Sequence, residues 1–366
     1  MNGMHNMTQK QIFTPEEIRQ NRGDKLNLRD RDFCDALNIS EAELAAAYCG
    51  PLAKSELETT KALRISAHPD QVIEAAVTFG EVMALTRNIS CVHEKTGRFE
   101  NYHSGVHAAM VLGKDIDLRI FPSQWCHGFI LEKPTENGLR RSMQIFDAAG
   151  DAVHKISLKE ASDLSAWDTA CRALSADDQS PNIALTARRA TEAPRINSEK
   201  IDILRAEWTR MTDTHQFLRL TSKLKMNRLG AYRCVGRPFA RPLTPKHVDE
   251  MLELVKDAGI EVMVFVGNRG CIQIHSGPIE TLVSMGPWQN VMDLNFNLHL
   301  RRDHIHEVWA VDKPTQRGPA LSIEAFDQDG GLIFQIFAVH KDHNDNRPKW
   351  KEIIDGLVST DQDIDL

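Results

Sequence analysis

The feature that most constrains this chain is an internal repeat with a constant spacing of 180 residues. The segment EVMALTRNISCVHEKTG, which begins at Glu81, aligns without a gap with EVMVFVGNRGCIQIHSG, which begins at Glu261. Between residues 81–150 and 261–330, 18 positions are identical. Ordinary residue usage would give roughly four by chance. The sequence therefore predicts two copies of one structural unit.

Short apolar–polar alternation within each copy predicts half-buried antiparallel strands. Examples are IDLRIF (116–121), FNLHL (296–300) and SIEAF (322–326), and glycine-containing turns separate such segments. Residues 246–258 predict a helix before the second strand set, with one apolar face formed by Val248, Met251, Leu252 and Val255.

Three further helices follow from the same reasoning. Residues 69–80 match the helix at 246–258, residues 158–174 close the first unit, and WKEIIDGLVS closes the second. We therefore expect an α+β tandem duplication, with two large antiparallel sheet units flanked by helices and packed about a pseudo-twofold. The predicted domains are 1–180 and 201–366, and the polar, proline-containing segment 181–200 is the predicted linker.

Composition excludes several classes of protein. The formal net charge is −7, with 51 acidic and 44 basic residues, which argues against nucleic acid as a partner. Seven cysteines without a C-x-x-C pair predict reduced thiols and a cytoplasmic location. No apolar run is long enough to span a membrane, and the polar N-terminal segment predicts no signal peptide. The sequence contains no HExxH motif and no glycine fingerprint after a strand, so it predicts no zinc, nicotinamide or flavin site.

The candidate chemistry centres on His215. Residues 201–224 predict one long helix, and on it Trp208, Met211, His215 and Leu218 recur at spacings of three and four. His215 would then interrupt an apolar face. It is either a core histidine bonded to a carbonyl or a ligand.

A basic run follows this histidine, and it ends at Arg228. A histidine in an apolar wall with cations at one rim suits a flat apolar ligand that carries carboxylates, such as haem. A solvated helix face is the ordinary alternative for such a run.

Alternation in IDLRIF places Leu118 and Ile120 on one face of a strand and Arg119 on the other. The residue 180 positions after Arg119 is His299, so the two copies differ at this position. A surface ladder of Asp117 and Arg119 is the alternative to a functional arginine.

At these residues the chain resembles the bacterial hemin-degrading or haem-trafficking proteins of the HemS/ChuS/HmuS type. The matching segments are EWTRMTDTHQF (207–217), IEVMVFVGNRGCIQIHSG (260–277), IDLRIFPSQW (116–125) and the two KPT segments, and the likeness covers roughly residues 30–360. It implies cytosolic proteins of haem-uptake systems that take part in iron acquisition and hold non-covalent haem b.

The resemblance also implies roles for individual residues. His215 matches the axial ligand of the haem iron, and Arg119 matches the distal, catalytic arginine from the N-terminal half. Arg228 and Lys313 match haem-binding cations. Phe337 stands where the family often has a tyrosine near the haem edge, and this removes one hydroxyl donor. His93 is a candidate for a second haem site, although its register partner is Gln273.

Two functions follow from this resemblance, and a third does not need it. The first is oxidative haem degradation with an external reductant, which releases iron. The second is a non-enzymatic carrier that delivers haem to a separate haem oxygenase. A reductase or the cytoplasmic face of a haem transporter would be further partners of a monomer or dimer. The third is a duplicated interaction protein without a ligand.

Overall fold

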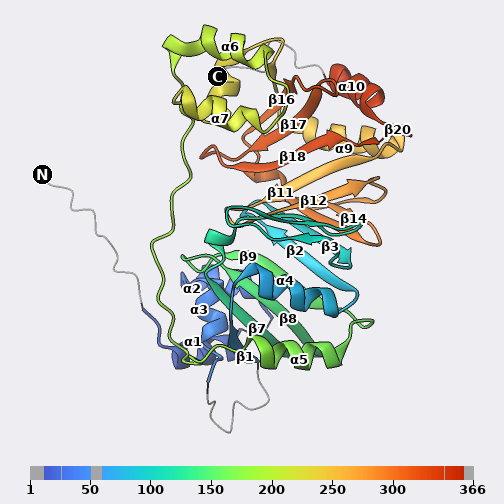
Figure 1. Ribbon diagram of the computed structural model, residues 1–366. Coiled ribbons are helices and arrows are strands. Elements are labelled where there is room, and N and C mark those ends of the chain that lie inside the picture. The colour runs from blue at the N-terminus through green and yellow to red at the C-terminus, as the bar shows by residue number, and fades with distance from the viewer. Residues whose placement is uncertain (1–11, 26, 51–59, 342, 358–366) are drawn as a thin grey trace, which may run out of the picture. The chain divides into compact units, whose positions relative to one another are not determined.

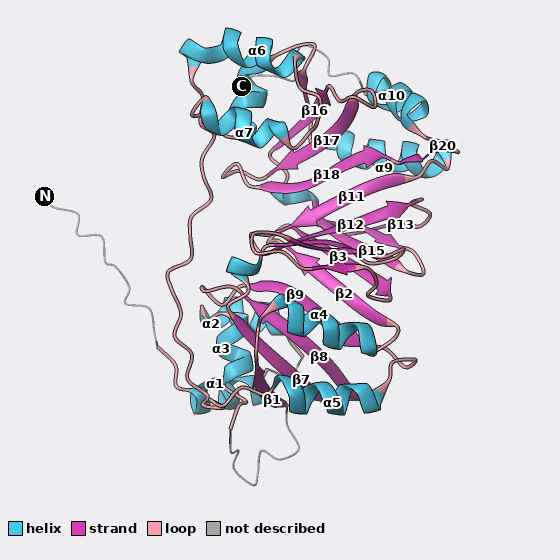
Figure 2. Cartoon of the chain, in the orientation of Figure 1, coloured by secondary structure: helices cyan, strands magenta, loops and turns pink. Residues whose placement is uncertain are grey.

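The computed structural model describes residues 12–25, 27–50, 60–341 and 343–357. Within them the chain is an α+β protein with two large antiparallel sheets (Figures 1 and 2). The helices are α1 (Pro15–Gly23), α2 (Asp30–Leu37), α3 (Glu41–Ala46), α4 (Pro69–Thr78), α5 (Leu164–Leu174), α6 (Ile201–Thr209), α7 (Gln216–Lys223), α8 (Arg228–Val235), α9 (Lys246–Ala258) and α10 (Arg347–Gly356).

Each large sheet has nine strands. The order in the first is β1 (Lys61–Ile65), β7 (His127–Thr135), β8 (Gly138–Phe146), β9 (Ala152–Leu158), β2 (Val82–Arg87), β3 (Cys91–Gly97), β15 (Phe296–Arg301), β14 (Trp288–Met292) and β13 (Leu282–Met285). The order in the second is β10 (Ala240–Leu243), β16 (Glu307–Lys313), β17 (Ala320–Phe326), β18 (Leu332–Ala338), β11 (Val262–Gly267), β12 (Cys271–Gly277), β6 (Asp117–Ile120), β5 (Ala109–Leu112) and β4 (Tyr102–His103). A short hairpin joins β19 (His340–Lys341) and β20 (Asn344–Asp345).

The two strand orders confirm the duplication. A shift of 180 residues relates each strand to the strand at the same place in the other sheet. For example, β3 corresponds to β12 and β8 corresponds to β17. The predicted helix at 246–258 is confirmed as α9, whereas α5 begins only at Leu164, because the Asp163 carboxylate accepts two backbone N–H groups there.

The chain divides into two compact units that differ from the two repeats. The second unit contains residues 85–100 and 111–119 of the N-terminal repeat together with 189–366. Within this unit β3 pairs with β15, and Lys95 lies opposite Phe296. The predicted boundaries, 1–180 and 201–366, follow the two repeats rather than these compact units. As domain boundaries they stay a prediction.

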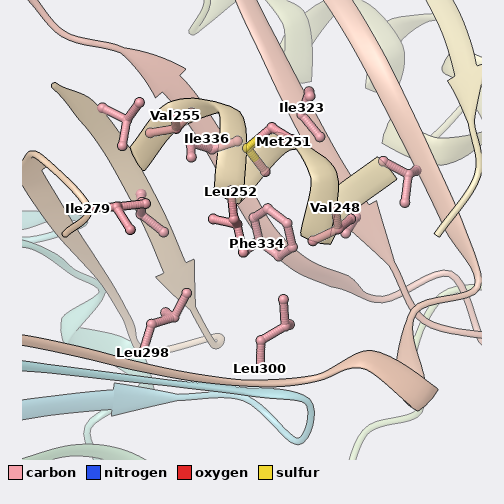
Figure 3. Close-up of a cluster of buried hydrophobic side chains, with 14 of the residues drawn as sticks. Val248, Met251, Leu252, Val255, Ile279, Leu298, Leu300, Ile323, Phe334 and Ile336 are labelled. Atoms are coloured by element: carbon pink, nitrogen blue, oxygen red, sulfur yellow. The ribbon is translucent and has the colours of Figure 1, made fainter. Parts of the chain in front are cut away.

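The apolar core of the second unit lies between α9 and the strands beneath it. Figure 3 shows Met251 and Leu252 of α9 directed toward Phe334 and Ile336 of β18. The four apolar residues predicted for this helix face are all buried. The amphipathic pattern therefore identified the buried face correctly.

Strand β17 differs from its predicted half-buried state, because helices cover both of its faces. Ile323 and Ala325 belong to the core under α9. Phe326 belongs to a second apolar cluster with Trp208 and Tyr232, which α6 and α8 contribute. Ser322 and Glu324 are completely buried as well. A carboxylate on such a strand needs strong partners.

No helix within the described ranges is long and apolar enough to cross a membrane.

Substitution of Met251 by Ala tests this core. The side chain is completely buried, so we expect the free energy of unfolding to fall by about 2–5 kcal/mol. Urea denaturation followed by tryptophan fluorescence measures it. Glu250→Ala on the exposed side of α9 is the matched control and should change the midpoint little. Equal effects of the two substitutions would contradict this packing.

Candidate functional site

The predicted single helix over 201–224 is wrong, because the chain leaves the helix after Thr209 and re-enters it at Gln216. Side chains replace the missing helical hydrogen bonds. The Asp213 carboxylate accepts the His215 backbone N–H at 2.7 Å, and the Gln216 side chain accepts the Thr212 N–H at 3.0 Å. Short polar residues compete with helical bonds in this way.

His215 consequently occupies the N-cap of α7 instead of a buried helix face. Its side chain is exposed, as is Leu218, so the predicted apolar stripe is buried at Trp208 and Met211 but does not continue to His215. Among the described residues no side-chain hydrogen bond holds the imidazole. An accessible imidazole of this kind suits a ligand to an incoming metal centre better than the core histidine that was the alternative.

A cavity of about 510 Å³ has Thr214, the residue before His215, in its wall, and His215 itself is not one of its lining residues. Its apolar lining includes Phe265 and Phe337, whose rings meet edge to face with centroids 5.4 Å apart. The volume is in the range of small-molecule and cofactor sites. The other main lining residues are Met263, Leu321, Trp350, Asp312, Arg317, His340, Asp345, Arg347 and Lys351.

The three cations that line this cavity differ in their partners. Arg347 binds Asp345 through two bonds of 2.8 Å, and Lys351 pairs with Asp355. Arg317 is exposed, and its guanidinium makes no ion pair within the part of the chain that the structure describes. Arg317 is therefore the cation at the cavity that is available to a ligand carboxylate.

Arg228 and Lys313 are brought together by a residue that the sequence reasoning missed. Glu324 is completely buried, and its carboxylate lies 2.6 Å from Lys313 Nζ and 2.9 Å from Arg228 Nη1. Burial alone would raise the pKa of Glu324, but the two cations outweigh it and hold the pKa at about 2. The carboxylate is thus ionised, and it forms an ion pair with each of the two cations.

Strand β6 shows the predicted alternation, since Leu118 and Ile120 are buried and Arg119 between them is half-buried. Its guanidinium donates to the Asp117 carboxylate and to the Leu118 carbonyl at 3.1 Å. It does not line the cavity described above. Its distal role stays a prediction.

His93 is buried completely on β3, with its ring centroid 5.0 Å from that of Phe296. A second haem site at His93 stays a prediction. Nearby, Lys95 Nζ lies 3.1 Å from His275 Nδ1, and the His275 ring stacks on Phe296 with centroids 3.8 Å apart.

The predicted site residues thus fall into three places. Phe337 and the residue before His215 meet at the cavity, Arg228 and Lys313 meet at Glu324, and Arg119 and His93 lie on other strands. Glu324 was detectable as a lone acid in the apolar strand SIEAF. Arg317 gave no signal, because a basic residue in a turn is ordinary.

Comparison with known proteins decides the family. The family model of the haemin-degrading HemS/ChuX domain matches residues 38–174 of this chain and again residues 225–357. This chain belongs to that family. The two matched segments agree with the duplication.

Curated relatives in the HemS/ChuX family are hemin transport proteins. The chain is 36% identical to HmuS of Yersinia pestis, over 90% of this chain and 93% of that protein. It is 35% identical to HemS of Yersinia enterocolitica, over 94% of this chain and 97% of that protein.

Solved structures in the HemS/ChuX family have the same fold. Holo-PhuS, a heme-binding protein from Pseudomonas aeruginosa, is 36% identical with a TM-score of 0.88, over 95% of this chain and 100% of that one. ChuS, described as an E. coli heme oxygenase, is 31% identical with a TM-score of 0.79, over 93% of this chain and 100% of that one.

Substitution of Glu324 by Gln tests the buried ion cluster. We expect a loss of about 3–5 kcal/mol in the free energy of unfolding at pH 7, because two buried cations lose their carboxylate. Since the folded pKa of Glu324 lies below its unfolded value, its contribution is present above about pH 4.5 and is lost as the pH falls toward 2. The difference in stability between wild type and variant should therefore shrink over that range. A constant difference from pH 7 to pH 2 in urea denaturation would contradict the ionised cluster.

Proposed function

We propose that this chain binds non-covalent haem b in the cavity beside His215 and degrades it oxidatively to release iron. The observation that carries the proposal is an accessible histidine without a side-chain partner next to an aromatic-lined cavity of about 510 Å³. Two similar proteins support it, since PhuS is a heme-binding protein and ChuS is described as a heme oxygenase.

The lining residues suit the chemistry of a haem. Imidazole is a common axial ligand of haem iron, and His215 can supply it from the start of α7. Phe265 and Phe337 offer apolar faces to the macrocycle, and Arg317 offers a guanidinium to a propionate. Arg228 and Lys313, the cations expected from the family resemblance, both pair with Glu324, whose single negative charge offsets one of their two positive charges.

Oxidative cleavage would need dioxygen and an external electron donor, and the haem itself supplies the redox chemistry. In this proposal the chain would orient the haem through His215, and Arg119 would be the distal hydrogen-bond donor that the family resemblance implies. The protein would act in the cytoplasm, as a monomer or dimer, with a reductase as a partner.

The alternative is a carrier that holds haem at the same site and passes it to a separate haem oxygenase. The descriptions of HmuS and HemS as hemin transport proteins favour this second candidate. A carrier would dock to the oxygenase or to the cytoplasmic face of a haem transporter.

Substitution of His215 by Ala tests the axial ligand. We expect the dissociation constant for haem to rise by more than about ten-fold, since even partners that only orient a metal ligand are worth that much. A haem titration followed at the Soret band measures it. His306→Ala, at another exposed histidine of the same unit, is the matched control and should bind as the wild type does. If wild type and His215→Ala both gave equally weak, non-saturating spectra, haem binding would be rejected. The third hypothesis, a duplicated interaction protein without a ligand, would then remain.

A single-turnover reaction with haem, dioxygen and an electron donor separates degradation from delivery. We expect the Soret band of the wild-type complex to decay. Arg119→Ala should keep most of its haem affinity while the decay slows by up to about a hundred-fold, because a donor to the reacting oxygen is lost. An unchanged Soret band together with rapid transfer to an acceptor protein would favour the carrier. Equal decay in Arg119→Ala would remove Arg119 from the mechanism.

A further inference from the structure

The loop that carries His215, residues 212–216, has few attachments to the rest of the second unit. Met211 before the loop and Phe217 after it are buried, whereas His215 itself is exposed. The side-chain hydrogen bonds of Asp213 and Gln216 stay within the loop. Such bonds fix the local turn, but they do not determine where the loop lies in the unit.

One backbone hydrogen bond attaches this loop to a strand connection. The Gln316 N–H donates to the Thr212 carbonyl at 3.0 Å. Gln316 belongs to the tight turn Thr315–Gly318 between β16 and β17, in which the Gly318 N–H donates to the Thr315 carbonyl at 3.1 Å. Among the described residues, this is the one hydrogen bond that the loop makes outside itself and the two helices that flank it.

Arg347, at the start of α10, holds the same turn. Its guanidinium donates to the Arg317 carbonyl, and two further bonds of 2.8 Å fix it on the Asp345 carboxylate. The hydrogen bond from Arg347 lowers the pKa of Asp345 to about 2, so this carboxylate is ionised at neutral pH. A guanidinium held by two parallel bonds has a defined direction, which the ammonium of a lysine would lack.

The turn leaves room for this arginine because residue 318 is a glycine. A Cβ atom at Gly318 would lie 3.2 Å from Nη1 of Arg347. The first repeat has a similar turn, Thr135–Gly138, and in both turns the threonine hydroxyl donates to the glycine carbonyl. At Gly138, however, a Cβ atom would meet none of the described residues within 4 Å. The turn is thus common to both copies, whereas its contact with an arginine belongs to the second.

We infer that the turn Thr315–Gly318, held by Arg347, positions the loop 212–216 and thereby sets where His215 meets the haem iron. Gln316 and Arg347 are positioning residues, because they act on the iron ligand through the backbone of the turn. The loop, the turn and the start of α10 all contribute residues to the wall of the same cavity. The inference rests on the proposed function, since it concerns the same bound haem.

The first test replaces Gln316 by Pro. Proline has no N–H and is favoured at the second position of such turns, so the change removes the bond to Thr212 and keeps the turn. In haem titrations we expect the dissociation constant to rise roughly two- to ten-fold, which corresponds to one neutral hydrogen bond. The absorption bands of histidine ligation should weaken. Glu136→Pro, at the same position in the turn of the first repeat, is the matched control and should bind haem as the wild type does.

The same two variants are compared without haem by amide hydrogen exchange. Exchange in residues 212–216 should become faster in Gln316→Pro, because the loop loses its bond to the turn, and should not change in Glu136→Pro. Unchanged exchange in Gln316→Pro would overturn the inference. Faster exchange with a wild-type haem affinity and spectrum would overturn it as well, because the position of the loop would then not matter to the iron.

The second test does not depend on the folding of a proline variant, because it removes the guanidinium by Arg347→Met. Lys349→Met, which removes a positive charge from an exposed side chain of the same helix, is the matched control. Arg347 lines the cavity, so haem is compared with haem dimethyl ester, whose propionates carry no charge. A positioning residue should weaken both ligands by the same factor. Weaker binding of haem alone would overturn the inference, because Arg347 would then bind a propionate, and so would unchanged binding of both ligands.

Failure of the proposed function gives a different pattern. If wild type and His215→Ala give the same spectra with haem, the proposed function fails, and the role of the turn toward the iron fails with it. If His215→Ala loses the bands of histidine ligation while Gln316→Pro and Arg347→Met keep the wild-type affinity, the haem site stands and the positioning role alone is lost.

Discussion

The ion cluster around Glu324 is the interaction on which the arrangement of the candidate site depends. A completely buried carboxylate is tolerated only with close, well-bonded cations, and Lys313 and Arg228 meet that need from β16 and α8. Lys313 is buried with Glu324, whereas the Arg228 side chain stays 22% exposed. Helix α8 is therefore tied to β16 and β17 by charge as well as by apolar packing.

Much of the fold was accessible from the sequence, because repeats and amphipathic patterns are local and periodic. The register of 180 residues, the buried face of α9 and the alternation at Leu118 and Arg119 all follow from spacing alone. The break after Thr209 did not follow, since it depends on side-chain bonds from Asp213 and Gln216 that helical periodicity ignores.

The candidate site was less accessible for a different physical reason. Residue types that bind haem could be named one at a time, but their pairing depends on which strands lie side by side. The structure pairs both Lys313 and Arg228 with Glu324, and their predicted contact with haem stays a prediction. Conversely, Arg317 lines the cavity and has no carboxylate partner among the described residues, and only the folded structure reveals this. Charge compensation is a property of the folded chain, and composition does not reveal it.

The contact between Lys95 and His275 shows what two copies of a unit within one chain permit. These residues are 180 positions apart, so they hold the same place in the two copies, and they touch each other. In a symmetric dimer a position that meets its own copy must carry the same side chain twice, and two lysines there would repel. Burial lowers the pKa of His275 to about 3, so its neutral ring accepts a bond from the ammonium of Lys95. A single chain can thus pair a donor with an acceptor where a homodimer is restricted to self-complementary groups.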